Sequence, residues 1–341
     1  MTFKSSTNSY LGINIGSSSI KIVELKNNNN KLNLLTYGFS ENVFNENNDL
    51  HKSREYAIGI LQEILKKAKI KSRNAVVSLP TSSIFSSIIS LPNIEENEIA
   101  LAVEAQAKKI IPLPIEEMEI DWKKISSDKN DIKILLTCAP KTLIKQYVDI
   151  ISEAGINLMS IETEIFALTK ALIGNDQSSI MIVEIGANTT DIFIIFQGVP
   201  VLSRSINVGG FLITKAISSV LQINIHRAEQ FKYDASIESL QSNKNIPAEI
   251  IIETINPIIN EIKYMLRLFQ DRNNKTVNKI ILSGGSSFIP NFTNYLSKIL
   301  NVNVVIGDPW FRINYPVELK PILFEIGPRL SVAIGLAMTH E

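Results

Sequence analysis

The chain has 341 residues, of which 45% are hydrophobic and 20% are charged, the composition of a globular protein with ample core material. Lysine plus arginine equals aspartate plus glutamate at 34 each, so no basic excess favours bulk nucleic-acid binding. The single cysteine, Cys138, excludes an intramolecular disulfide, and no apolar run reaches the roughly 18 residues of a spanning helix. We therefore expect a soluble cytoplasmic protein of one to three domains that meets a membrane only through a partner.

The first part of the chain is predicted to form a strand meander followed by a helix. Residues 10–38 read as the meander, with a turn at 27–30, since asparagine tolerates left-handed conformations. A loop is expected at 45–49, and apolar side chains at helical spacing predict a helix over 53–69. A strand at 75–80 ends at a proline.

Residues 81–154 differ in character and are predicted to be a compact α+β unit inserted into a larger fold. Their pattern predicts strand, helix, strand and strand at 83–91, 95–110, 118–125 and 131–139, with a polar turn at 126–130. A helix over 141–154 follows and is closed by Gly155. Cys138 lies in one of these apolar runs and is expected to be a buried strand residue.

The second half repeats the order of meander and then helices. A helix at 162–173 leads into strands at 180–186, 191–196 and 199–206, then helices at 209–221, 225–234 and 248–271. A strand at 277–282, a helix at 289–300, a strand at 302–306 and a helix at 328–339 complete the chain. The repetition predicts two α/β halves with a ligand cleft between them.

Two short stretches of the chain share one pattern. Leu11–Ile22 and Met181–Ile192 each have a β-branched strand, a polar position, Ile-Gly, small or hydroxylic residues and a second apolar strand. Their glycines, Gly16 and Gly186, lie half the chain apart. Glycine lets the backbone approach a ligand closely, and successive N–H groups of such a tip form an anion-binding concavity. Two such hairpins can hold a phosphate tail from both sides.

A third glycine site follows a buried strand late in the chain. Ile280–Ser287 runs from apolar residues into Ser-Gly-Gly-Ser-Ser and then a predicted helix. Bare backbone beside a helix N-terminus suits a flat base or a phosphate, because the helix dipole favours an anion there.

These three sites, in this order, resemble the phosphate-1, phosphate-2 and adenosine motifs of the actin-like ATPase superfamily. The stretches 11–25, 184–191 and 198–210 further resemble the PilM family of type IV pilus assembly, and 91–122 resembles its inserted SHS2-type subdomain. The resemblance implies an α/β actin-like ATPase fold with two ribonuclease-H-like halves. The implied divisions are a first half of 1–80, 155–176 and 326–341, an insert of 81–154, and a second half of 177–325 with a helical subdomain at 211–275.

The resemblance also implies which residues meet ATP and its Mg²⁺. Those expected at the terminal phosphates are Gly16, Ser17, Ser18 and Ser19, with Gly186, Ala187, Asn188 and Thr189 closing from the second half. Those expected at the adenosine are Gly284, Gly285 and Ser286, with Glu229 and Lys232 at the ribose and base. The last two residues are equally well explained as a solvated pair on a helix.

Departures from the superfamily pattern bear on catalysis. Asn14 stands where an aspartate helps hold the magnesium shell, and Glu184 stands where aspartate is usual, while Asp191 keeps the acid at the end of the hairpin. Glu162 loosely matches an acid near the attacking water. Because Mg²⁺ prefers carboxylate and water oxygens, we expect nucleotide binding with slow or no hydrolysis, so the chain is at most a slow ATPase.

The sequence thus leads to three functional hypotheses. In the first, the chain is an ATP-binding scaffold of a type IV pilus, or of a related secretion or competence machine. The family resemblance implies that such a scaffold sits at the inner membrane and holds the cytoplasmic N-terminal segment of a PilN-like protein, near 83–125. The second is an FtsA-like divisome or filament protein, and the third is a small-molecule kinase, for which no convincing general base is found. A homo-oligomer is left open.

Overall fold

A six-stranded sheet forms the first half of the computed structural model, which describes residues 9–29, 31–40, 53–111, 113–127, 131–234 and 246–338. Its strand order is β14-β3-β2-β1-β4-β8. The strands are β1 (Ser9–Ile15), β2 (Ile20–Asn28), β3 (Lys31–Phe39), β4 (Asn74–Leu79), β8 (Asn157–Thr163) and β14 (Ile313–Asn314). The first three form the expected antiparallel meander, and β4 and β8 continue in parallel. Helices α1 (Arg54–Lys67) and α3 (Lys141–Glu153) pack on one face.

A five-stranded sheet forms the second half, in the order β11-β10-β9-β12-β13. The strands are β9 (Ile180–Ile185), β10 (Thr190–Phe196), β11 (Val199–Ile206), β12 (Lys279–Ser283) and β13 (Asn303–Ile306). The helices on its outer face are α5 (Gly210–Leu221), α6 (Ile225–Asp234), α7 (Ile246–Asn273) and α8 (Phe292–Leu300). Alternate β-branched residues of β9, β10 and β12 face these helices, as a sheet covered on both sides requires.

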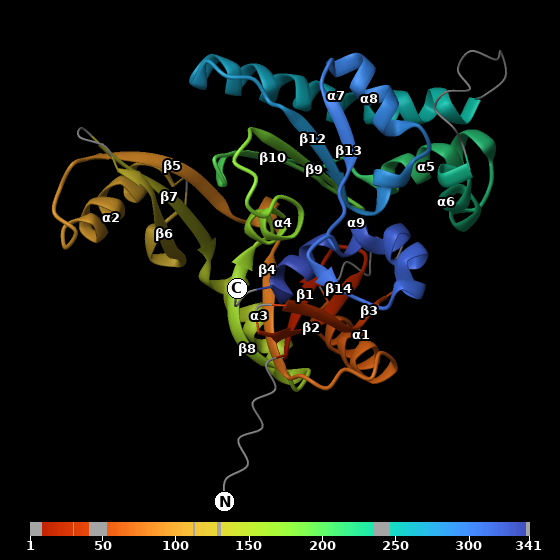
Figure 1. The fold of residues 1–341 in the computed structure, drawn as a ribbon, viewed down its shortest axis with the longest axis horizontal. Coiled ribbons are helices and arrows are strands. Elements are labelled where there is room, and N and C mark those ends of the chain that lie inside the picture. Colours follow the sequence, from red (N-terminus) through yellow and green to blue (C-terminus); the bar gives the residue numbers. More distant parts are fainter. Residues whose placement is uncertain are drawn as a thin grey trace, which may run out of the picture.

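Two helices form the layer between the sheets. Helix α4 (Glu164–Leu172) and helix α9 (Lys320–Ala337) share one buried cluster with residues of both sheets, and Figure 1 shows them between the lower and upper halves. Backbones meet closely in this layer. A Cβ on Gly12 would lie 1.8 Å from the Ala333 carbonyl oxygen, and one on Gly335 would lie 1.9 Å from that of Ala167.

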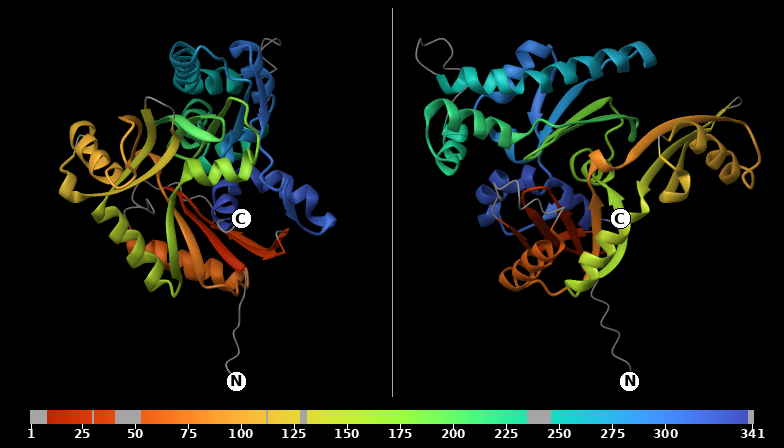
Figure 2. Two further views of the ribbon diagram at one scale, coloured as in Figure 1. Left: turned by 60° about the vertical axis from the view of Figure 1, so that its left-hand side comes forward. Right: turned by 180° about the vertical axis from the view of Figure 1, so that it is seen from behind.

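A third sheet belongs to the inserted unit, which projects to one side of the two halves (Figures 1 and 2). Its strands are β5 (Phe85–Pro92), β6 (Met118–Ser127) and β7 (Asp131–Pro140), in the order β5-β7-β6. Helix α2 (Ile99–Ile110) covers one face through Ile99, Val103 and Ala107. Cys138 is buried in this small core, as expected for a strand cysteine.

The structure differs from the expected elements in four places. Residues 157–163 form strand β8, which was not predicted, and so Glu162 lies on a strand rather than on a helix. The two-residue β14 was also not predicted, and α9 begins at residue 320 rather than 328. Helix α3, which was expected within the inserted unit of 81–154, packs on the first half through Tyr147, Ile150 and Ile151, and we propose that the unit ends at Pro140.

The loop expected at 45–49 lies outside the described residues, as do residue 30 of the turn at 27–30, residues 128–130 of the turn at 126–130 and residue 339 of the last helix. Within the described ranges, every helix is too short or too polar to cross a membrane.

The close contact of α9 with its neighbours gives a stability prediction. Gly335→Ala should lower the free energy of unfolding by at least about 1–3 kcal/mol, because the added Cβ overlaps backbone atoms that cannot move independently. The matched control is Gly59→Ala on α1, where a Cβ meets nothing within 4 Å. That change should raise stability by about 0.5–1 kcal/mol, the helix penalty of glycine relative to alanine. Urea unfolding followed by circular dichroism measures both, and equal effects of the two changes would contradict the prediction.

Candidate functional site

The two glycine hairpins have the same geometry at their tips. In the first, β1 and β2 close at the pair Ile15 and Ile20, and the Gly16 N–H donates to the Ser19 carbonyl at 3.0 Å. In the second, the Gly186 N–H donates to the Thr189 carbonyl at 2.9 Å. Each tip is therefore a four-residue turn whose backbone N–H groups lie at the carboxyl end of a buried strand.

Both tips and the late glycine turn meet at one cleft of about 500 Å³ between the halves. The predicted residues that line it are Ser18, Ser19, Glu184, Gly186, Ala187, Glu229, Lys232, Gly284, Gly285 and Ser286. The other predicted phosphate residues, Gly16, Ser17, Asn188 and Thr189, complete the two tips without lining the cleft. Sequence reasoning did not find the remaining lining residues: Lys21, Ile185, Gly210, Phe211, Tyr233, Phe288, Glu325, Ile326 and Arg329.

Glycines hold the second tip and the late turn in contact. Gly284 has a φ of +84°, and a Cβ there would lie 2.3 Å from the Ile185 carbonyl oxygen. Gly210, the first residue of α5, donates its N–H to the Gly186 carbonyl at 2.9 Å, and a Cβ on it would lie 2.1 Å from the Ser286 hydroxyl. A Cβ on Gly285, by contrast, meets nothing within 4 Å. This side of the cleft is therefore bare backbone with room beside it.

Glu229 and Lys232 form a buried pair on α6 rather than a solvated one. The Lys232 side chain is 2% exposed, and its Nζ donates to both carboxylate oxygens of Glu229 at 2.8 Å. It also donates to the Thr214 hydroxyl at 3.2 Å, and that hydroxyl donates in turn to Glu229. Burial lowers the pKa of Lys232, and the Glu229 charge opposes that shift. The pair fixes one wall of the cleft.

Acidic side chains gather beside the second hairpin tip, and one of them, Glu184, lines the cleft. Glu184 on β9 and Asp191 on β10 are directly opposite each other in the antiparallel register, where like charges repel. Burial raises the pKa of Glu184 well above its usual value, and the Glu164 and Asp191 charges add to the shift. Burial and then Glu164 raise the pKa of Asp191 to about 8. Oε2 of Glu184 and Oδ1 of Asp191 are buried without a hydrogen-bond partner in the protein.

Lys21 is the cation beside these acids. It lies opposite Asn14 in the β1–β2 register, and a Cβ on Gly16 would lie 3.0 Å from its Nζ. Burial lowers its pKa to about 8, Arg329 adds to that shift, and Glu184 and Glu164 oppose it. The sequence held a signal for Lys21, since a four-residue tip places it on the same sheet face as Asn14.

Asn14 is held by Glu164 and not by Glu162. The Asn14 side-chain N–H groups donate to the Ser78 hydroxyl and to Oε1 of Glu164, both at 3.1 Å. Glu162 lies on β8 rather than on a helix, where it pairs with Lys170 at 2.8 Å and is not among the residues that line the cleft. Glu164, the first residue of α4, is the acid that contacts the first hairpin through Asn14.

The donor set fits a nucleotide with its Mg²⁺ better than a metal held by protein alone. Among the described residues, no three His, Cys, Asp or Glu side chains are grouped to hold a metal ion. Of the three residues expected at the metal, only Glu184 lines the cleft, while Asn14 and Asp191 are buried behind it. The residues present would therefore offer a hydrated Mg²⁺ that arrives on phosphates one carboxylate at the cleft surface. Mg²⁺ usually keeps several waters and takes one or two carboxylates in such sites.

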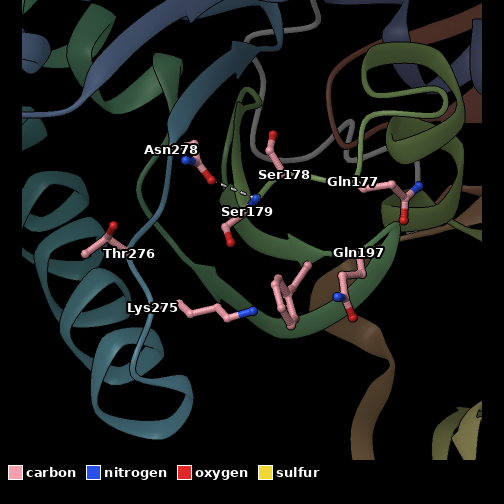
Figure 3. A pocket seen from close by; sticks show the side chains of 8 residues that line it. Gln177, Ser178, Ser179, Gln197, Lys275, Thr276 and Asn278 are labelled. Carbon is pink, nitrogen blue, oxygen red and sulfur yellow. Dashed lines mark hydrogen bonds between the residues drawn. The ribbon is translucent and has the colours of Figure 1, made fainter.

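A hollow of about 730 Å³ lies at the other end of the second sheet (Figure 3). It is lined by Gln177, Ser178, Ser179, Phe196, Gln197, Lys275, Thr276 and Asn278. Six of these residues precede the parallel strands β9 and β12, and Phe196 and Gln197 lie at the end of the antiparallel strand β10. The hollow is therefore at the amino ends of the parallel strands, whereas ligands of open α/β sheets bind at the carboxyl ends. The hollow has no acidic lining residue, and its one cation, Lys275, lies over the Phe196 ring at 4.4 Å. The cleft between the halves is therefore the better candidate site.

Comparisons with known proteins agree with the fold. The chain aligns over 97% of its length with a solved PilM–PilN type IV pilus biogenesis complex, covering 98% of that chain at TM-score 0.83 and 21% identity. It also aligns over 98% with MreB5 of Spiroplasma citri bound to ADP, covering 96% of that chain at TM-score 0.57 and 14% identity. At these identities the likeness establishes an actin-like fold.

Sequence comparisons add the family. The cell division protein FtsA of Enterococcus hirae is 21% identical over 89% of this chain and 79% of its own length. The model of the family described as type IV pilus assembly protein PilM matches residues 12–341. Since that match spans nearly the whole sequence, the chain belongs to the PilM family of type IV pilus assembly proteins.

Proposed function

We propose that this chain is a nucleotide-binding scaffold of type IV pilus assembly that binds ATP in the cleft between its halves. The observation that carries the proposal is the convergence of two equivalent glycine tips and the Gly284–Gly285 turn on one cleft. The tips offer backbone N–H groups to phosphates, and Lys21 adds a positive charge at the same end. The bare backbone at Gly285 leaves space for a flat base. MreB5, which shares the fold, was solved with ADP bound.

The chemistry of the phosphate end favours binding over rapid hydrolysis. Bound Mg²⁺ would neutralise phosphate charge and position an attacking water. Asn14 offers that ion a carbonyl without a negative charge, and its amide is engaged by Glu164. With the metal shell weakened in this way, the chain is a slow ATPase at most, and ATP acts by holding the two halves in one relative orientation.

We further propose that the partner is the cytoplasmic N-terminal segment of a PilN-like inner-membrane protein. The support is family membership together with a relative solved in a PilM–PilN complex. The inserted SHS2-like unit, near residues 83–125, is the proposed place of contact, and the chain would then sit in the cytoplasm, at the inner membrane through this partner. The FtsA relatives share the fold, but the family match favours pilus assembly over division.

Nucleotide binding is tested by filling the bare side of the cleft. Isothermal titration calorimetry should detect ATP binding to the wild-type chain, and Gly285→Val should weaken it by about tenfold or more, roughly 1.4 kcal/mol. The unfolding temperature should be unchanged, because the new side chain meets no atom within 4 Å of its Cβ. Turnover of bound ATP should stay below about 1 per second, the lower bound of kinases. Equal ATP affinity in the variant would contradict the placement, and no affinity in either would refute nucleotide binding.

The crowded acids predict a pH dependence in the nucleotide-free protein. The pKa of Asp191 is about 8 in the folded chain and about 4 unfolded, so the folded state binds the proton more tightly. The contribution of protonated Asp191 to the free energy of unfolding is complete below pH about 4 and is lost as the pH rises to about 8. Asp191→Asn should therefore flatten this decline and stabilise the chain by about 1 kcal/mol or more at pH 8.

Asp176 provides the matched control for that measurement. Its hydrogen bond with Lys279 lowers the pKa of Asp176 to about 2, so its contribution is present above pH about 4 and is lost as the pH falls toward 2. Asp176→Asn should therefore leave unchanged the fall in stability that Asp191 causes between pH about 4 and about 8. Thermal unfolding across this pH range compares the variants, and a decline that is unchanged in Asp191→Asn would contradict the assignment.

The partner is tested with a peptide that carries the cytoplasmic N-terminal sequence of the PilN-type protein from the same organism. Fluorescence polarisation should show saturable binding of this peptide, and saturating ATP should change its Kd. A scrambled peptide of the same composition serves as the control. The absence of specific binding both with and without ATP would count against the scaffold role.

A further inference from the structure

The first chain crossing into the inserted unit is a short turn where three parts of the molecule meet. The 3₁₀ turn η2 (Thr81–Ser83) follows β4 of the first half and leads into β5 of the insert. Both η2 and β5 lie against β11, the edge strand of the second half. A small shift in this turn therefore changes how the insert sits on both halves.

Glu164 holds this turn with one carboxylate oxygen. Its Oε2 accepts the Thr81 backbone N–H at 3.1 Å and the Thr81 hydroxyl at 2.9 Å. Thr81 is buried, and its neighbours Ser82 and Ser83 are exposed. Because Thr81 is screened from water, these hydrogen bonds are electrostatically stronger than they would be in water.

The other oxygen of the same carboxylate holds the phosphate hairpin. Its Oε1 accepts from the Asn14 side chain at 3.1 Å, and Asn14 lies opposite Lys21 in the hairpin register. One side chain, fixed at the start of α4, thus bridges the candidate nucleotide cleft and the chain crossing into the insert.

We propose that Glu164 is a positioning residue that couples nucleotide occupancy of the cleft to the order of the turn at Thr81 and hence to the inserted unit. The inference rests on the proposed nucleotide binding and adds the route by which the partner-binding unit senses it. Nucleotide phosphates at the first tip would restrict the motion of the Asn14 and Lys21 side chains. Because Asn14 donates to Glu164, the motion of the Glu164 carboxylate would then be restricted as well. Because Thr81 donates twice to that carboxylate, its amide opens less often. Linkage makes the coupling reciprocal, so a partner that orders the turn raises nucleotide affinity by the same factor.

Hydrogen exchange of the full chain measures the coupling directly. With saturating Mg-ATP, exchange in peptides covering 79–92 should slow by about fivefold or more, the low end of typical coupling. Thr81→Val removes one donor to Glu164 without touching the cleft, and should reduce the slowing to less than about twofold at unchanged ATP affinity. Glu164→Gln, which keeps the side-chain volume, should have the same effect on exchange. Ser82→Ala in the same turn is the matched control and should behave as wild type.

Isothermal titration calorimetry of ATP binding to the same samples distinguishes a failure of the coupling from a failure of nucleotide binding. If ATP binds to the wild type and exchange at 79–92 does not change, the coupling is overturned while the proposed function stands. The same conclusion follows if Thr81→Val keeps the full slowing. If ATP does not bind at all, both proposals fail.

Discussion

Helix α9 can lie against both halves only because two glycines let backbones touch. Gly12 on β1 and Gly335 on α9 stand where a Cβ would overlap carbonyl oxygens of Ala333 and Ala167. Because α9 packs this closely on β1 and α4, it also reaches the second half. There the Pro328 carbonyl accepts the Gly284 N–H at 3.0 Å and the Ser283 hydroxyl at 3.1 Å. The glycine turn of the second half is thus fixed to a helix packed on the first. The cleft exists because this helix sets the distance between the two sheets.

The cleft so formed has unbalanced charge at one end. After burial, the Glu164 charge raises the pKa of Glu184 and of Asp191, and Lys21 is the cation beside them. Two carboxylate oxygens there lack protein partners, and a buried unpaired polar atom costs roughly 1–3 kcal/mol. Such a cost is tolerated where a ligand relieves it, and the cation of the proposed nucleotide would do so. The opposite wall, where Lys232 is fully engaged by Glu229, carries no such imbalance.

The two hairpin tips and the glycine turn could be predicted from local sequence. Strand β8 and the cleft residue Arg329 could not, because their positions depend on contacts between distant parts of the chain. Gly16, Gly186 and Gly284 were recognisable through the order and separation of the three sites, since a single glycine turn after a strand is also explained by a tight turn alone. Strand β8 was missed because its side chains do not alternate clearly between apolar and polar, and its pairing with β4 comes from the tertiary fold. Glu162 was proposed from a loose match to a superfamily motif, and that match could not show that Glu164, two residues later, is the acid that contacts Asn14. Arg329 was unpredictable for a similar reason, since only the crossing of α9 brings it to the cleft.

The two halves share a hairpin but use it differently, and this asymmetry suits a scaffold better than a fast enzyme. In the second half, carbonyls of the tip are taken by N–H groups of α5, which makes that wall rigid. In the first half, Asn14 is held through Glu164, which also holds the chain crossing into the insert. A ligand shifts a conformational equilibrium only by its differential affinity for the two states, so it must act on a contact that differs between them. Rapid hydrolysis would keep resetting that equilibrium. On the proposed function, an asparagine in place of an acid near the metal would slow hydrolysis and so lengthen the time for which the insert is held in its nucleotide-bound arrangement.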